Sequence, residues 1–173
     1  MEVFLLFAVC FGPLAFGCVE PWSLAVLELS LFALLLSPAP LPARARGLWL
    51  PACMLIALGL AQYLNAASTW GPISPLPSAA SRAEAGPTLL LWAAYAVLLW
   101  RLPSLLANHG TSRRLLWAIF AVAFLVALIG LAQQLSGLID FPIYGFRKVR
   151  ISRSPFGPYF NRNHAANLLA LSA

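Results

Sequence analysis

The stretch LLWAIFAVAFLVALIGLAQQL, Leu115–Leu135, decides the fold class of this chain. It carries no charged side chain over about 21 positions, and a helix of that length crosses the roughly 30 Å hydrocarbon core of a bilayer. Other apolar runs precede it, separated by short connections that hold most of the Pro and Arg residues. The sequence therefore predicts an all-α, polytopic transmembrane helix bundle with five spans, at approximately 3–17, 21–37, 48–65, 87–101 and 115–135.

Composition supports this class. The chain is 61% hydrophobic and 9% charged, whereas a soluble domain carries about 25% charged residues. We therefore expect a single membrane domain over residues 1–173. Cys10, Cys18 and Cys53 lie in or beside apolar runs without metal-ligand spacing, so we interpret them as small buried apolar residues.

Two polar features inside this pattern have a functional and a structural interpretation. Glu28 lies in the middle of the second expected span, where a carboxylate is costly unless it is paired or protonated. It is either a proton or substrate contact, as in a transporter, or a buried hydrogen bond between helices with Gln62 or Tyr63 as partner. His109, within Asn108–Gly110, is interpreted as a solvated residue at a helix end, because no metal-ligating side chain stands near it.

A short pattern recurs near the ends of the third and fifth spans. Gly59 and Gln62 are spaced like Gly130 and Gln133, each pair within a G-L-A-Q sequence. Small residues let two helices approach closely, and a Gln side chain can form a hydrogen bond across such a contact. Similar needs of helix packing are enough to explain the recurrence: close approach of two helices at the glycines, with Gln side chains able to form a hydrogen bond across the contact.

The connection 136–164 differs from the others. Several Pro and Gly residues interrupt it, and it holds five of the eleven Lys and Arg residues: Arg147, Lys148, Arg150, Arg153 and Arg162. We expect an interfacial, extracytoplasmic basic loop. The apolar run at 165–173 is shorter than a span, so we interpret it as the start of a sixth span in an N-terminal portion of a longer protein.

The chemistry of this loop suits an anionic ligand at a membrane surface. Guanidinium groups bind phosphate in a bidentate way, Asn161 and Asn163 can hold sugar hydroxyls or cap a helix, and His164 can act as an acid or base near neutral pH. Tyr159 and Phe160 either stack on a sugar or anchor in the interface. An equally open alternative is a non-enzymatic membrane protein whose basic loop binds anionic lipid or a partner.

Two stretches resemble a known family. FGPYFNRNHAA, at 156–166, resembles the G-P/T-F-x-N-R-N-H-x-A signature of the O-antigen ligase and polysaccharide polymerase family. GPLAFGCVEPW, at 12–22, resembles the P-L-x-x-G-x-V-E-P-W start of many bacterial members. Tyr159, Ala165 and Asn167 depart from the residues most frequent there.

The resemblance implies a multi-pass glycosyltransferase of the bacterial inner membrane. Such enzymes take a glycan from undecaprenyl diphosphate at the periplasmic face and transfer it to lipid A core, to another glycan or to protein, without a cofactor, an essential metal or nucleic acid. By position, Arg162 and His164 would be catalytic, and the substrate-binding residues would be Arg147, Lys148, Arg150, Arg153, Asn161 and Asn163.

Overall fold

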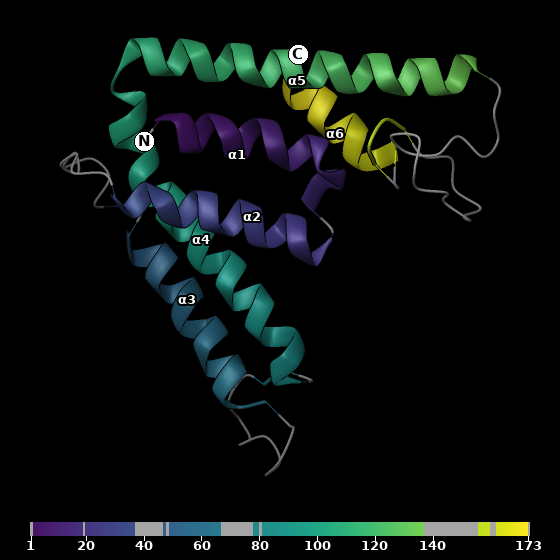
Figure 1. The fold of residues 1–173 in the computed structure, drawn as a ribbon. Coiled ribbons are helices and arrows are strands. Elements are labelled where there is room, and N and C mark those ends of the chain that lie inside the picture. Colours follow the sequence, from purple (N-terminus) through teal and green to yellow (C-terminus); the bar gives the residue numbers. More distant parts are fainter. Residues whose placement is uncertain are drawn as a thin grey trace. The chain divides into compact units, whose positions relative to one another are not determined.

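The computed structural model describes residues 2–18, 20–36, 47, 49–66, 78–79, 81–136, 156–159 and 162–172. Within these ranges the fold is all-helical, with one isolated bridge between Phe156 and Tyr159 (Figure 1). The elements in chain order are α1 (Glu2–Leu14), η1 (Phe16–Cys18), α2 (Pro21–Phe32), η2 (Ala33–Leu36), α3 (Trp49–Leu64), α4 (Arg82–Leu106), α5 (His109–Leu135) and α6 (Arg162–Ser172). Each expected span therefore coincides with a helix, and the expected start of a sixth span lies in α6.

Two of these helices are long and apolar enough to cross a membrane by length and composition. They are α4, with 25 residues, and α5, with 27. The other apolar helices are shorter, at Glu2–Leu14, Pro21–Leu36 and Leu50–Leu64. Two of the five expected spans thus lie in helices of sufficient length and apolar composition, and the expected number of five stays a prediction.

The chain divides into two compact units, which are described separately. The α1–α5 unit comprises Glu2–Leu27 and His109–Ala173, and the α3–α4 unit comprises Glu28–Asn108. The division passes through α2, so the first half of that helix belongs with α1. Whether both units form the single membrane domain expected from the sequence stays a prediction.

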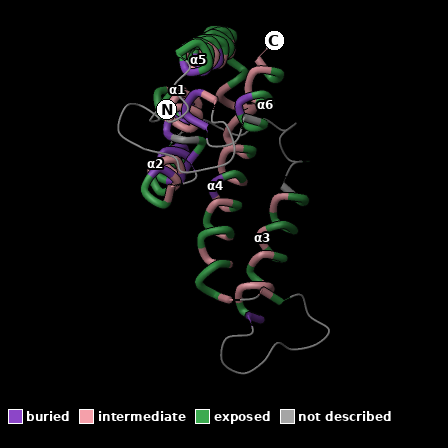
Figure 2. Tube along the Cα trace, turned by 90° about the vertical axis from the view of Figure 1, so that its right-hand side faces the viewer, coloured by how far each residue is buried: buried purple, intermediate pink, exposed green. Residues whose placement is uncertain are grey.

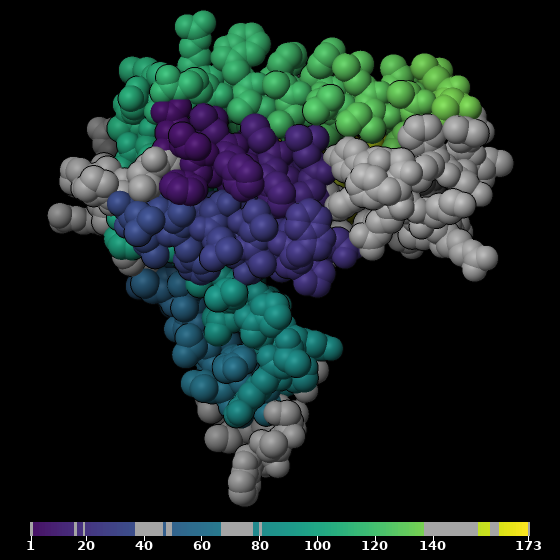
Figure 3. Space-filling view, in the orientation of Figure 1, coloured from purple at the N-terminus to yellow at the C-terminus, as the bar shows by residue number. Residues whose placement is uncertain are grey.

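In the α1–α5 unit, α5 packs against α1 and α6 along one face. Figure 2 colours the helices by burial. The buried residues of α5 recur mostly at helical spacing and comprise Thr111, Val122, Ala123, Val126, Gly130 and Gln133. The rest of α5 exposes large apolar side chains, among them Trp117 at 60% and Phe124 at 57%. The side chains of α1 lie against those of α5 in the space-filling view (Figure 3). A helix with one packed face and an otherwise apolar exposed surface fits contact with lipid.

In the α3–α4 unit, α3 and α4 pack against each other. A Cβ atom at Gly59 would lie 3.0 Å from Leu89, and one at Gly86 would lie 3.6 Å from Tyr63, so these glycines line the contact. Ser81 caps α4, because its hydroxyl accepts a hydrogen bond from the amide of Glu84 at 3.2 Å. The close approach expected at Gly59 is confirmed.

Several expectations from the sequence need correction. Asn108–Gly110 does not end a helix through a glycine with positive φ: α4 ends at Leu106, and α5 begins again at His109. Cys53 is exposed, whereas Cys18 is buried, so the thiols do not share one environment.

Glu28 is buried, as expected, with 6% of its surface exposed. The expected hydrogen bond to Gln62 or Tyr63 is not found at its Oε1 atom, which has no hydrogen-bond partner within the described ranges. The structural interpretation of Glu28 as an interhelical tie therefore lacks its expected partner at this oxygen.

Candidate functional site

The candidate site begins with a tight turn at Phe156–Tyr159. The amide of Tyr159 donates to the carbonyl of Phe156 at 3.2 Å, and the amide of Phe156 donates to the carbonyl of Tyr159 at 3.1 Å. Gly157 has a φ of +60°, and Pro158 must have a negative φ because of its ring. Positive followed by negative φ at the central positions defines a II′-type reversal, which requires glycine first. The Gly-Pro pair of the motif is thus explained by the turn.

The Gln133 side chain of α5 forms two hydrogen bonds with this turn. The Nε2 of Gln133 donates to the carbonyl of Gly157 at 3.0 Å, and the amide of Gly157 donates to the Oε1 of Gln133 at 2.7 Å. Both bonds are buried, and together they satisfy both backbone groups of Gly157. The hydrogen bonds of Gln133 therefore go to the backbone of a turn and not across a contact between two helices.

Small residues allow the turn to lie directly on α5. A Cβ at Gly130 would lie 2.3 Å from the Phe156 ring, and a Cβ at Gly157 would lie 3.1 Å from the carbonyl oxygen of Val126. A larger residue at either position would push the turn away from the helix. The spacing of Gly130 and Gln133 places a gap and a polar anchor on the same face, as helical periodicity requires.

The turn and the following helix share a small core. Its buried members are Val122, Val126, Tyr159 and Ala165, and Cys10, Leu14, Phe156 and Leu168 pack against them. Tyr159 is 8% exposed, so its ring belongs to this core. This corrects the interpretation of Tyr159 as a sugar-stacking or interfacial residue.

The two stretches that carry the resemblance meet in this core. Gly17, in η1, has a φ of +66°, and a Cβ there would lie 2.9 Å from a ring carbon of Tyr159. The next residue, Cys18, also has a positive φ, of 57°. Two constraints therefore require glycine at this corner: the positive φ of its backbone and the close approach of the Tyr159 ring.

The polar residues of the motif lie at the start of α6, directly after this core. Asn163 and His164 are exposed, and the next residue, Ala165, is 1% exposed and packed against α5. The helix begins at Arg162. The imidazole of His164 is thus accessible, while the next residue of the same helix, Ala165, is anchored in the core. The other expected site residues lie outside the described ranges: Arg147, Lys148, Arg150, Arg153, Asn161 and, beside them, Phe160.

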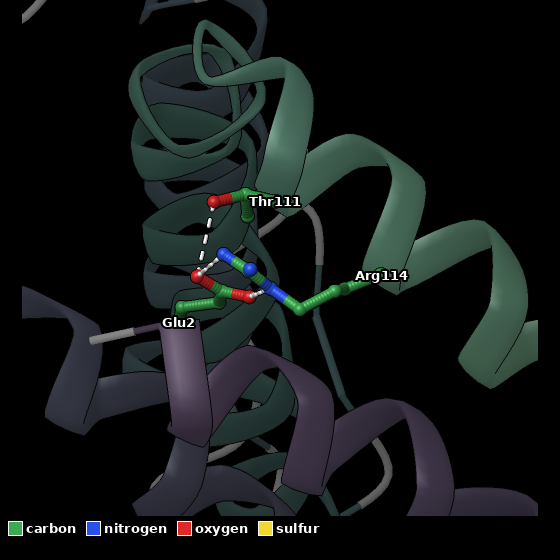
Figure 4. Close-up of polar contacts among 3 residues, drawn as sticks. All are labelled: Glu2, Thr111 and Arg114. Atoms are coloured by element: carbon green, nitrogen blue, oxygen red, sulfur yellow. Dashed lines mark hydrogen bonds and ion pairs between the residues drawn. The ribbon is translucent and has the colours of Figure 1, made fainter.

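Sequence reasoning missed one polar cluster, which joins the beginnings of α1 and α5 (Figure 4). The Nε of Arg114 donates to the Oε1 of Glu2, its Nη2 donates to Oε2 at 2.7 Å, and the Thr111 hydroxyl donates to Oε2 at 3.1 Å. The hydrogen bonds from Arg114 lower the pKa of Glu2 below its ordinary value. The sequence does place opposite charges, Glu2 and Arg114, at the starts of two apolar runs. That they form a pair depends on how the two helices pack.

No group of three His, Cys, Asp or Glu side chains that would suit a metal ion occurs within the described residues. No protein-family model matches the chain, and neither a curated protein nor a solved structure matches it.

Proposed function

We propose that the chain is part of a membrane glycosyltransferase of the O-antigen ligase and polysaccharide polymerase type. Its substrates would be a glycan on undecaprenyl diphosphate and an acceptor that is a glycan, lipid A core or protein. The reaction would take place at the periplasmic face of a bacterial inner membrane that the chain crosses five times, with α6 beginning a sixth span. Arg162 and the preceding basic residues would bind the diphosphate, and His164 would move the proton of the acceptor hydroxyl.

The observation that carries the proposal is the meeting of the two motif stretches. The residues of 12–22 and of 156–166 are far apart in sequence, yet Gly17 and Tyr159 are in contact and Ala165 shares their core. A chance sequence match gives no reason for two motifs to share one core. Their common packing, with His164 exposed beside it, is what a shared structural purpose of both motifs would require.

The direction of the helices supports the proposed topology. The salt bridge joins Glu2, the first residue of α1, to Arg114, near the start of α5, and the two helices pack against each other, so they run parallel. If both cross a membrane, they begin on the same side, and the number of crossings from α1 to α4 is even. Four crossings, one each for α1, α2 with η2, α3 and α4, satisfy this condition.

The test replaces His164 in the complete gene and measures glycan transfer in the native host. We expect His164→Ala to reduce the amount of ligated or polymerised glycan by about a hundredfold or more, the usual effect of losing a positioned acid or base. The matched control is His109→Ala, which removes the chain's other histidine, an exposed residue at the start of α5. Immunoblotting of membrane fractions checks that both variants insert equally.

A non-enzymatic lipid-binding protein is the second candidate, favoured by the burial of Tyr159, which gives part of the motif a structural role. It predicts unchanged glycan transfer in His164→Ala at normal membrane levels, and that result would refute the enzymatic proposal. If transfer does depend on His164, the glycan that remains after gene deletion distinguishes a ligase from a polymerase. Accumulation of lipid-linked long chains on gene deletion indicates a ligase, and retention of single capped repeats indicates a polymerase.

A further inference from the structure

Two adjoining pockets lie between α3 and α4. The polar pocket has a volume of about 210 Å³, and its lining includes Gly59, Gln62, Ser81, Glu84, Thr88 and Trp92. The apolar pocket has a volume of about 360 Å³, and it is lined by Ala52, Leu55, Trp92, Tyr95, Ala96 and Leu99. Trp92 lines both pockets, so they meet at this residue.

The spacing of the lining residues shows that the two pockets form one groove. On α4 these residues recur every three or four positions from Glu84 to Leu99, which places them on one face of the helix. On α3 they lie at positions 52, 55, 59 and 62, again at helical spacing, and the two helices pack against each other. The groove is therefore polar near the beginning of α4 and apolar further along. Leu55, Trp92 and Tyr95 are exposed, so the apolar part opens at the surface.

The polar part of the groove offers more hydrogen-bond acceptors than donors. The Ser81 hydroxyl accepts from the amide of Glu84 at 3.2 Å, and the Thr88 hydroxyl donates to the carbonyl of Glu84 at 3.2 Å. The Glu84 carboxylate only accepts, and the Gln62 amide both accepts and donates. Lys and Arg are absent from the described residues that line this pocket. A phosphate group needs donors and is repelled by a carboxylate, whereas sugar hydroxyls donate as well as accept.

We propose that this groove binds a glycolipid with an uncharged sugar headgroup, with the sugar at Gln62 and Glu84 and the hydrocarbon chain along the apolar pocket. Trp92, at the junction, offers an aromatic surface to the C–H groups of the sugar ring. Few polar groups at one end of an apolar groove fix the orientation of such a ligand. The inference rests on the proposed crossings, which place the beginning of α4 at the periplasmic face. It concerns a second ligand, since the diphosphate of the proposed donor requires the basic segment.

The experiment locates a photoreactive glycolipid on the full chain. The protein is reconstituted in phosphatidylcholine nanodiscs with an alkyl glucoside that carries a diazirine in its chain, and peptide mass spectrometry finds the labelled residues after irradiation. Unlabelled dodecyl maltoside and dodecyl phosphate, which share one chain, are the competitors. Label on Trp117 and Phe124, exposed residues of α5, reports general partition into the bilayer and should respond equally to both competitors.

We expect dodecyl maltoside to displace the label from Leu55, Tyr95 and Leu99 at about tenfold lower concentration than dodecyl phosphate, the effect of about two hydrogen bonds. Glu84→Gln should remove most of this difference, because the anionic competitor no longer meets a carboxylate. Gln62→Leu should weaken displacement by the maltoside alone. The matched control is Arg82→Gln: the Nη2 of Arg82 donates to the carbonyl of Leu64 at 3.5 Å, and the preference for the maltoside should remain without it.

Equal displacement by the two competitors in the wild-type protein, or a preference unchanged in both Glu84→Gln and Gln62→Leu, would overturn the proposal. Stronger displacement by dodecylamine than by the maltoside would also overturn it, since the carboxylate would then select a cation. If either variant does not fold, Thr88→Phe serves instead: its ring fills the polar pocket from an exposed position and must remove the preference for the maltoside. Glycan transfer enters none of these readouts, so failure of this site and failure of the enzymatic proposal are distinguishable.

Discussion

The paired hydrogen bonds between Gln133 and Gly157 give the sharpest stability prediction. Gln133→Leu keeps the approximate size of the side chain and removes both the donor and the acceptor. The amide and carbonyl of Gly157, which are buried, then lose their partners. We expect the turn at Phe156–Tyr159 to loosen from α5 and the chain to become less stable.

The magnitude follows from the two groups left unpaired. Each buried backbone group without a partner costs about 1–3 kcal/mol, so two cost about 2 kcal/mol at the lower end of that range. Hydrogen bonds between membrane helices average about 0.6 kcal/mol, which would give about 1.2 kcal/mol for the pair. The larger value should hold, because leucine offers Gly157 no substitute partner. For a chain of this size, 2 kcal/mol corresponds to a fall in Tm of about 4–8 °C.

The matched control is Gln134→Leu, which changes the adjacent glutamine, an exposed residue of the same helix. Thermal unfolding of both variants in detergent measures the global effect, and hydrogen exchange at the Gly157 amide measures the local one. We expect faster exchange at Gly157 in Gln133→Leu alone. A Tm equal to that of Gln134→Leu, with unchanged exchange at Gly157, would refute the role assigned to Gln133.

Two further predictions concern the corner after α1 and the pair at the beginnings of α1 and α5. Gly17→Ala should destabilise the chain by about 1–2 kcal/mol, because φ at this position is +66° and a tyrosine ring carbon would lie 2.9 Å from the new Cβ; Gly47→Ala, with nothing within 4 Å, should have little effect in the same thermal unfolding assay. Because Arg114 lowers the pKa of Glu2, the ionised carboxylate contributes stability above its ordinary value of 4.5, and this contribution is lost as the pH falls through the lowered value. Glu2→Gln should therefore lower the Tm at pH 7 and weaken its fall in acid, whereas Arg113→Gln should leave both unchanged, and identical acid profiles of wild type and Glu2→Gln would contradict the sign assigned to the pair.

The helices were predictable because their signals are local. Runs of apolar residues separated by Pro, Gly and Arg specify where a helix can form, and the helices follow the expected spans within a few residues. The errors occurred where local signals were ambiguous. Asn108–Gly110 can end one helix or begin the next, and the structure begins α5 at His109. The exposure of Cys53 depends on which face of α3 packs on α4, which a nearly uniform apolar helix does not specify.

The chemistry of the candidate site stays a prediction, and the packing that supports this part of the chain was not apparent from the sequence. Asn163 and His164 are recognised from the motif, and their exposure at the start of α6 agrees with an accessible site. The structural role of Tyr159 was not apparent, since an aromatic residue beside a basic segment suits a ligand as well as a core. Its burial follows from the gap that Gly17 leaves for its ring.

By itself, the sequence determined that the chain is helical and apolar and that its basic and Asn-rich segment directly precedes a final helix. These properties depend on composition and on neighbours a few residues apart. Only the tertiary structure decided that Gln133 rather than Gln134 holds the turn, that Gly17 meets Tyr159, and that Glu2 pairs with Arg114 across 112 positions. The physical reason is that such contacts depend on which helix faces meet, and adjacent residues with the same chemistry point to different faces.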